Sequence, residues 1–188
     1  MAFSGAILRR RCVALAVGCG LLATATLAAG QSTQIPITDG TSASGKRPVG
    51  ASGLKLPRFA ALRADEVNLR AGPGTRYPIE WVYKRRNLPV EIIDEFDTWR
   101  RIRDWEGTEG WVHQSMLHGR RSILIVDDLA MLRRDPQDDS RGVARLESGV
   151  VGRVDSCGEV WCVIIAANRK GWLRRDQFYG MYPEEQIQ

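Results

Sequence analysis

The sequence predicts an all-β protein in which two small tandem β-barrels follow a signal peptide and a flexible spacer. Three observations favour this fold class. The first 30 residues have the charge and apolar pattern of an export signal. From residue 62 onward, short apolar runs alternate with turn residues and show no helical period. A set of motifs then occurs twice, about 60 residues apart.

Residues 1–30 are expected to be a secretory signal peptide. Three arginines at positions 9–11 precede an apolar run over residues 12–22, and small residues fill positions 23–30. The apolar run is shorter than the ~20 residues of a membrane-spanning helix, so no membrane span is expected in the mature form. A retained membrane anchor and a lipid-anchored Cys19 are the alternatives. Export makes the protein periplasmic or secreted.

Removal of the signal peptide changes both the charge and the cysteine content. The whole chain has 27 Lys+Arg and 22 Asp+Glu, and residues 1–30 contain three arginines and no acidic residue. The mature chain therefore has 24 basic and 22 acidic residues, and a net charge of +2 gives no basis for nucleic-acid binding. Two cysteines remain, Cys157 and Cys162, and an oxidising compartment favours a disulfide between them.

The composition changes again near residue 58. Residues 31–57 are rich in Ser, Thr, Gly and Pro with few large apolar side chains, which predicts a disordered spacer. Beyond it, strands are predicted at residues 90–93, 99–103, 110–112, 123–126 and 161–165. Hairpin turns are predicted at residues 106–110 and 168–171. Several short strands spaced in this way indicate small barrels.

The internal repeat sets the domain boundaries. Residues 65–70 (DEVNLR) correspond to residues 128–133 (DLAMLR), and residues 110–112 (GWV) correspond to residues 171–173 (GWL). Pro73 and Trp99 have counterparts in Pro136 and Trp161. The first barrel is expected over residues 58–118, the second over 122–179, and a C-terminal tail over 180–188. Because so few residues separate the two units, the barrels are expected to pack on each other.

The repeated motifs resemble bacterial Src-homology-3 (SH3-like, SH3b-type) domains. The resemblance rests on Leu-Arg-x-Gly-Pro at residues 69–73, Trp99 later in the unit, and Gly-Trp-Val at residues 110–112, with the matching positions in the second copy. The Cys157–Cys162 segment is similar to the paired cysteines of exported members. The resemblance implies a five- to six-stranded barrel and a non-catalytic binding or targeting role, commonly at the bacterial cell wall.

Catalytic and cofactor sites find little support in the sequence. The segment VNLRAGPGTRYP (residues 67–78) lacks the further glycine or Lys-Ser/Thr of a phosphate-binding loop, and the second copy has neither glycine. The two histidines of the mature chain, His113 and His118, are too few for a catalytic zinc site, which usually has about three protein ligands. The acidic turns at residues 94–97 and 135–139 leave a hydrolase as an alternative. The expectation is no catalytic residue, no metal and no cofactor.

Aromatic residues are the positive signal for a binding site. In domains of this family, exposed aromatic residues beside the long first loop bind peptide ligands. A groove of this kind is expected in the first barrel, formed by Tyr77, Trp81, Tyr83, Trp99 and Trp111. The alternative is a core position for half of these residues, Trp111 in particular. The expected partner is cell-wall (peptidoglycan) peptide or an envelope protein. A scaffold that binds only other envelope proteins is the alternative.

Overall fold

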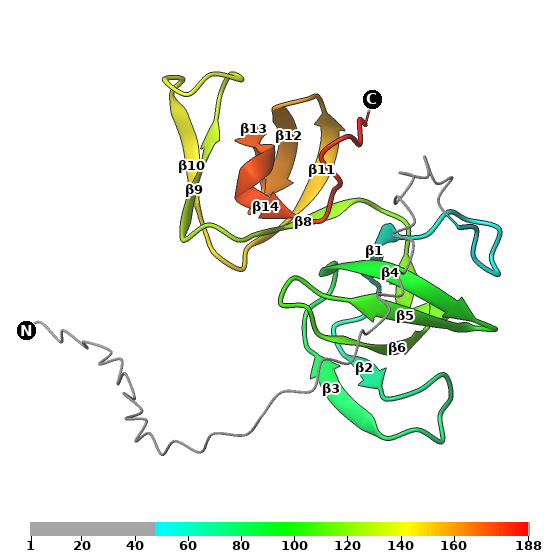
Figure 1. Ribbon diagram of the computed structural model, residues 1–188. Coiled ribbons are helices and arrows are strands. Elements are labelled where there is room, and N and C mark those ends of the chain that lie inside the picture. The colour runs from blue at the N-terminus through cyan, green and yellow to red at the C-terminus, as the bar shows by residue number, and fades with distance from the viewer. Residues whose placement is uncertain (1–47, 188) are drawn as a thin grey trace, which may run out of the picture. The chain divides into compact units, whose positions relative to one another are not determined.

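The computed structural model describes residues 48–187, so the expected signal peptide and the first part of the expected spacer lie outside the described residues. The described chain consists mainly of strands, together with two 3-10 helices of three residues each, η1 (Gln114–Met116) and η2 (Arg175–Gln177) (Figure 1). Within residues 48–187, no helix has the length and apolar character needed to cross a membrane.

Each repeat forms one antiparallel seven-stranded sheet. In chain order the strands of the first are β1 (Arg58–Leu62), β2 (Val67–Arg70), β3 (Ile79–Tyr83), β4 (Pro89–Phe96), β5 (Trp99–Arg103), β6 (Glu109–His113) and β7 (Leu117–His118). Those of the second are β8 (Ser122–Ile125), β9 (Leu129–Arg133), β10 (Gly142–Glu147), β11 (Val151–Cys157), β12 (Trp161–Ala166), β13 (Arg169–Arg174) and β14 (Phe178–Tyr179).

The two sheets have the same topology. Their strand orders are β3-β2-β6-β5-β4-β1-β7 and β10-β9-β13-β12-β11-β8-β14, so every strand of the first repeat has its counterpart in the second (Figure 1). The 3-10 helix precedes the last short strand in both copies. The prediction of an all-β protein with two tandem SH3-like barrels is confirmed.

The Leu-Arg and Gly-Trp motifs meet at one place in each barrel. Leu69 and Leu132 are fully buried, and each packs against the glycine of the Gly-Trp pair. A Cβ atom on Gly110 would lie 2.6 Å from Leu69 Cγ and 3.0 Å from the Arg70 carbonyl oxygen; on Gly171 it would lie 2.6 Å from the Arg133 carbonyl oxygen. These glycines are therefore required for the close approach of β6 to β2 and of β13 to β9.

Residues 48–57, the end of the expected spacer, are ordered against the first barrel. Val49 and Lys55 form an isolated β-bridge, and Leu56 is 6% exposed in the same core cluster as Val90 and Ile102. The ordered part of the chain thus includes residues that have the composition of a spacer. A single buried leucine and a few polar contacts are enough to hold this short turn on the barrel.

The second barrel carries the predicted disulfide. Cys157 and Cys162 are directly opposite each other on β11 and β12 and form a disulfide, as expected. The expected C-terminal tail continues onto the same hairpin, because Ile187 forms a bridge with Cys157 and packs against the second core. The disulfide closes a loop of only a few residues, so it stabilises one hairpin locally.

Aromatic contacts join the two barrels. The Phe59 ring on β1 lies 5.1 Å from the Tyr179 ring and 4.8 Å from the Tyr182 ring. The Tyr182 hydroxyl donates to Glu91 Oε1 at 2.7 Å, and Arg121 donates to the Phe59 carbonyl oxygen at 2.7 Å. The end of the second repeat therefore packs on the first strand of the first repeat.

Adding one methyl group at the glycine of either Gly-Trp pair should destabilise that barrel. We expect Gly110→Ala and Gly171→Ala each to lower the free energy of unfolding by about 1–3 kcal/mol, because the new Cβ overlaps buried leucine and backbone atoms. Urea unfolding followed by tryptophan fluorescence measures this. Gly119→Ala is the matched control, since its Cβ would meet no atom within 4 Å. Equal stability of all three variants would contradict the close-approach argument.

Candidate functional site

The loop between β2 and β3 is held by the arginine that follows Leu69. Arg70 Nη1 donates to the carbonyl oxygens of Thr75 at 3.1 Å and Tyr77 at 2.8 Å. The Tyr77 ring lies over Gly72, where a Cβ would come within 2.5 Å of the ring. The glycine thus makes room for an aromatic side chain.

The outer face of the first sheet carries a cross-strand row of long side chains. Arg70 on β2 pairs with Trp111 on β6, Trp111 pairs with Arg101 on β5, and Arg101 pairs with Asp94 on β4. Directly opposed residues in antiparallel strands lie on the same face. Trp111 is half-buried in this row, and Arg101 forms an ion pair of 2.8 Å with Glu109.

A second row, of aromatic rings, lies beside the first. Trp99 on β5 is opposite Phe96 on β4 and His113 on β6. The Trp99 and His113 rings meet edge to face with centroids 5.5 Å apart, and Phe96 is 60% exposed. We call Phe96, Trp99, Trp111 and His113 the aromatic strip. It presents apolar ring surface on paired strands, which fix the positions of the rings.

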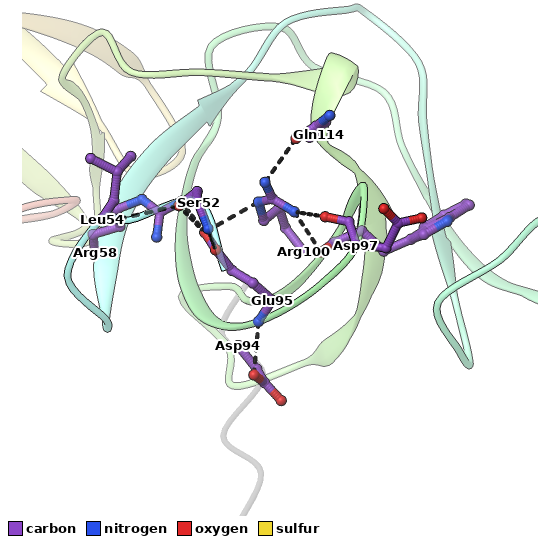
Figure 2. Close-up of polar contacts among 9 residues, drawn as sticks. Ser52, Leu54, Arg58, Asp94, Glu95, Asp97, Arg100 and Gln114 are labelled. Atoms are coloured by element: carbon purple, nitrogen blue, oxygen red, sulfur yellow. Dashed lines mark hydrogen bonds and ion pairs between the residues drawn. The ribbon is translucent and has the colours of Figure 1, made fainter. Parts of the chain in front are cut away.

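An ion cluster supports the β4–β5 hairpin from the other side of the sheet (Figure 2). Glu95 has a fully buried side chain and forms ion pairs with Arg58 and with Arg100, the latter at 3.2 Å. The backbone N–H and hydroxyl of Ser52 also donate to this carboxylate, at 2.7 and 2.8 Å. Each carboxylate oxygen of Glu95 therefore has a strong donor, as a buried charge requires.

Arg100 connects this cluster to the hairpin turn. Its Nη1 donates to the carbonyl oxygens of Asp97 and Trp99, at 2.8 and 2.9 Å, and its Nη2 donates to Gln114 Oε1 at 2.7 Å (Figure 2). The turn that separates Phe96 from Trp99 is consequently bound to a buried guanidinium. This arrangement holds the end of the aromatic strip in place.

The surroundings of Glu95 control its ionisation. Burial of the carboxyl opposes ionisation, but hydrogen bonds from Ser52 and Arg58 outweigh it and hold the pKa of Glu95 below its usual value. Glu95 is therefore ionised at neutral pH and remains so into the acidic range.

The five residues predicted for the groove occupy three different environments. Trp99 and Trp111 share the outer face, and the backbone of Tyr77 is bound to Arg70 beside Trp111. Tyr83 lies in the core, 3% exposed, with its hydroxyl donating to Asp104 Oδ2 at 3.0 Å. This corrects its assignment to the groove, because an apolar pocket and a buried carboxylate partner already enclose its ring and hydroxyl.

Trp81 is exposed but lies away from the strip. It is opposite Leu69, whose side chain is in the core, so the pair faces the opposite side of the sheet from Arg70 and Trp111. Trp81 is nevertheless 58% exposed, because β3 is the end strand of the sheet and its ring extends past the core. Phe96 and His113 take its place on the outer face. Phe96 was not predicted as a site residue. The sequence Phe-Asp-Thr-Trp could have indicated it, because an aromatic residue lies on each side of a two-residue turn and the two are then opposite each other.

The second barrel repeats the framework but not the surface. Arg133 pairs with Trp172, as Arg70 does with Trp111, and Arg133 donates to the Ser140 carbonyl oxygen in its own first loop. The position of Arg101 is taken by Val163, which is 8% exposed.

The Trp161 ring of the second barrel has a cationic neighbour in place of a histidine. The Arg174 guanidinium lies over this ring at 5.9 Å. Arg174 also forms ion pairs with Asp138 and Asp176, at 3.2 and 3.0 Å. The cation beside Trp161 is therefore already paired with two carboxylates of its own barrel.

Three carboxylates of the acidic turns, those of Glu95, Asp135 and Asp138, make structural contacts. Glu95 is bound as described, Asp138 pairs with Arg174, and Asp135 accepts a hydrogen bond from the Ser140 hydroxyl at 3.1 Å. Among residues 48–187, no three His, Cys, Asp or Glu side chains come together as a metal site would require.

Comparison with known proteins identifies the family. The model of the bacterial SH3 domain matches residues 63–119 and 126–178, which together make up more than half of the chain. The protein belongs to the bacterial SH3 domain family, with two tandem copies, as the sequence predicted. The family is one of binding domains. No curated protein matches the sequence.

Two solved structures with a low overall similarity are NlpC2 and NlpC1 from Trichomonas vaginalis. NlpC2 is 10% identical with a TM-score of 0.32, and the match covers 69% of this chain and 50% of that one. NlpC1 is 11% identical with a TM-score of 0.31, covering 66% and 46%. The chain thus spans about half the length of these two proteins.

Removing the charge of Glu95 should destabilise the first barrel in a pH-dependent way. Because folding lowers its pKa, Glu95 stabilises the fold fully above the usual carboxyl pKa, and this contribution is lost as the pH falls through the folded-state value. We expect Glu95→Gln to cost about 1.5–3 kcal/mol at pH 7, the size of a hydrogen-bonded charge, and much less at pH 3. Urea unfolding at a series of pH values measures the difference.

Glu66→Gln serves as the control for this experiment, since Glu66 forms only an exposed ion pair of 3.8 Å with Lys84. A Glu95→Gln cost that stays constant from pH 7 to pH 3 would contradict the proposed role of the carboxylate.

Proposed function

We propose that this protein is an exported, non-catalytic module that binds cell-wall peptide through the aromatic strip of its first barrel. The observation that carries the proposal is the cross-strand row of Phe96, Trp99 and His113 beside Trp111. Exposed aromatic rings on rigid strands supply contact area at a low cost in side-chain entropy. Membership of the bacterial SH3 family supports a binding role.

The distribution of polar groups around the strip suits a peptide. Arg101 and Glu109 lie next to Trp111, and Arg70 lies on its other side. A short peptide has apolar side chains for the rings, and it has amide and carboxylate groups for these neighbours. The stem peptides of peptidoglycan have this mixed character. The first barrel is assigned the binding role because Val163 and the ion-paired Arg174 occupy the matching positions of the second.

Export to the periplasm or cell exterior is part of the same proposal. The disulfide between Cys157 and Cys162 favours an oxidising compartment, and residues 1–30 have the pattern of a signal peptide. A non-catalytic role is supported by the structural engagement of Glu95, Asp135 and Asp138.

Truncating the strip should weaken wall binding without unfolding the barrel. We expect Trp99→Ala and Trp111→Ala each to reduce retention on purified peptidoglycan about tenfold or more, as loss of a central aromatic contact does. Co-sedimentation with purified peptidoglycan measures the retention, and thermal unfolding of each variant shows whether the barrel is intact.

Trp105→Ala is the matched control. Trp105 is 38% exposed and lies in the loop after β5, at the opposite end of that strand from Trp99. Retention of the Trp99 and Trp111 variants equal to that of the control would exclude the strip as the binding site. Failure of the unmodified protein to sediment with peptidoglycan, together with crosslinks to envelope proteins, would favour the scaffold alternative.

A further inference from the structure

A pocket lies along the segment that joins the two barrels. Its volume is about 230 Å³. Its walls come from the loop before β4, the joining segment, β11 and the turn between β12 and β13. The polar residues that line it are Asn87, His118, Arg120, Arg121, Ser122, Arg153 and Asn168, with no Asp or Glu among the lining residues. This composition sets it apart from the aromatic strip.

The positive charge of this pocket is only partly neutralised. Arg121 forms ion pairs with Glu185 and donates to the Phe59 carbonyl oxygen. Arg120 and Arg153 are exposed, and within the described part of the chain neither forms an ion pair. Two guanidinium groups are therefore available to a ligand. Arginine pairs with carboxylate and phosphate groups through two parallel hydrogen bonds.

His118 sits at the wall of this pocket in its neutral form. The Arg120 backbone N–H donates to His118 Nδ1 at 3.3 Å, so Nε2 carries the ring proton and donates to Asn87 Oδ1 at 3.1 Å. Burial lowers the pKa of His118, and the nearby charges of Arg120, Arg63 and Arg86 lower it further. Burial and the neighbouring arginines therefore both favour the neutral ring.

Ser122 supplies an independent sign of a missing partner. The residue is 6% exposed and lines the pocket, and its buried hydroxyl has no hydrogen-bond partner. Buried hydroxyl groups are nearly always paired, because leaving one unpaired costs free energy. An occupant that brings a hydrogen-bonding group to this wall would remove that cost.

We propose that this pocket binds an oxyanion, a phosphate or carboxylate group, held by Arg120 and Arg153 with Ser122 at its base. The site goes beyond the peptide-binding function of the strip, since the two share no residue. Its position between the repeats also means that an occupant would contact both barrels at once, with Asn87 and His118 on one side and Arg153 and Asn168 on the other.

The two histidines of the chain allow a direct test, because His118 lines the pocket and His113 belongs to the strip. The imidazole signals are followed by NMR across pH while inorganic phosphate or succinate replaces sodium chloride at constant ionic strength. Binding should raise the pKa of His118 and leave His113 unchanged, because a nearby anion favours the charged imidazole. The phosphate and succinate arms distinguish the two oxyanions.

A double variant, Arg120→Gln/Arg153→Gln, should weaken this response about tenfold or more, the effect of removing two charge-assisted contacts. A second double variant, Arg134→Gln/Arg141→Gln, removes two exposed arginines of the second barrel that do not line the pocket, and so controls for net charge. The proposal would be overturned if the pKa of His118 were the same in phosphate and succinate as in sodium chloride. It would also be overturned if the rise in this pKa were as large in the Arg120→Gln/Arg153→Gln variant as in the unmodified protein.

The Arg120→Gln/Arg153→Gln variant should still bind peptidoglycan, and Trp99→Ala should still bind phosphate. The two proposals can therefore be tested independently of each other.

Discussion

Each barrel depends on the contact between its Leu-Arg strand and its Gly-Trp strand. At this contact a fully buried leucine packs on a glycine, with no room for a Cβ. The pairing is short, one residue pair in each sheet, Arg70 with Trp111 and Arg133 with Trp172. It connects the β2–β3 hairpin and the loop it carries to the rest of the sheet. The same residues that close the barrel therefore determine where the arginine and tryptophan of the outer face lie.

This constraint explains why two copies with one framework can have different surfaces. The inward-facing leucine and the glycine are shared, because the close approach fails without them. Outward positions are free to vary, and Arg101 of the first copy is matched by Val163 in the second. The aromatic strip arises on this variable face, where exposed Phe96 stands beside Trp99. The basic pocket arises where the copies are joined.

Local signals explain how much of the fold could be predicted. The hairpins and the Cys157–Cys162 pair follow from residues close in sequence, and the repeat follows from short motifs that are each local. The Glu95 cluster could not be found in this way, because Arg58 lies 37 positions away and Ser52 falls in a segment with the composition of a linker. Tyr83 was misplaced because it shares strand alternation with exposed Trp81, and only the cross-strand partners separate a core ring from an exposed one. Likewise, the basic pocket depends on contacts between repeats that no single motif encodes.

In the proposed function the aromatic strip is the binding face, with Trp111 positioned by the closing contact and Phe96 and Trp99 by the hairpin that Arg100 holds. The most direct measurement is NMR of the six tryptophan indole N–H signals during titration with a soluble muropeptide. We expect shifts at Trp99 and Trp111, accompanied by shifts of the His113 ring, while the Trp105, Trp161 and Trp172 signals stay in place. Shifts confined to Trp161 and Trp172, or no shift of any indole at saturating muropeptide, would contradict it.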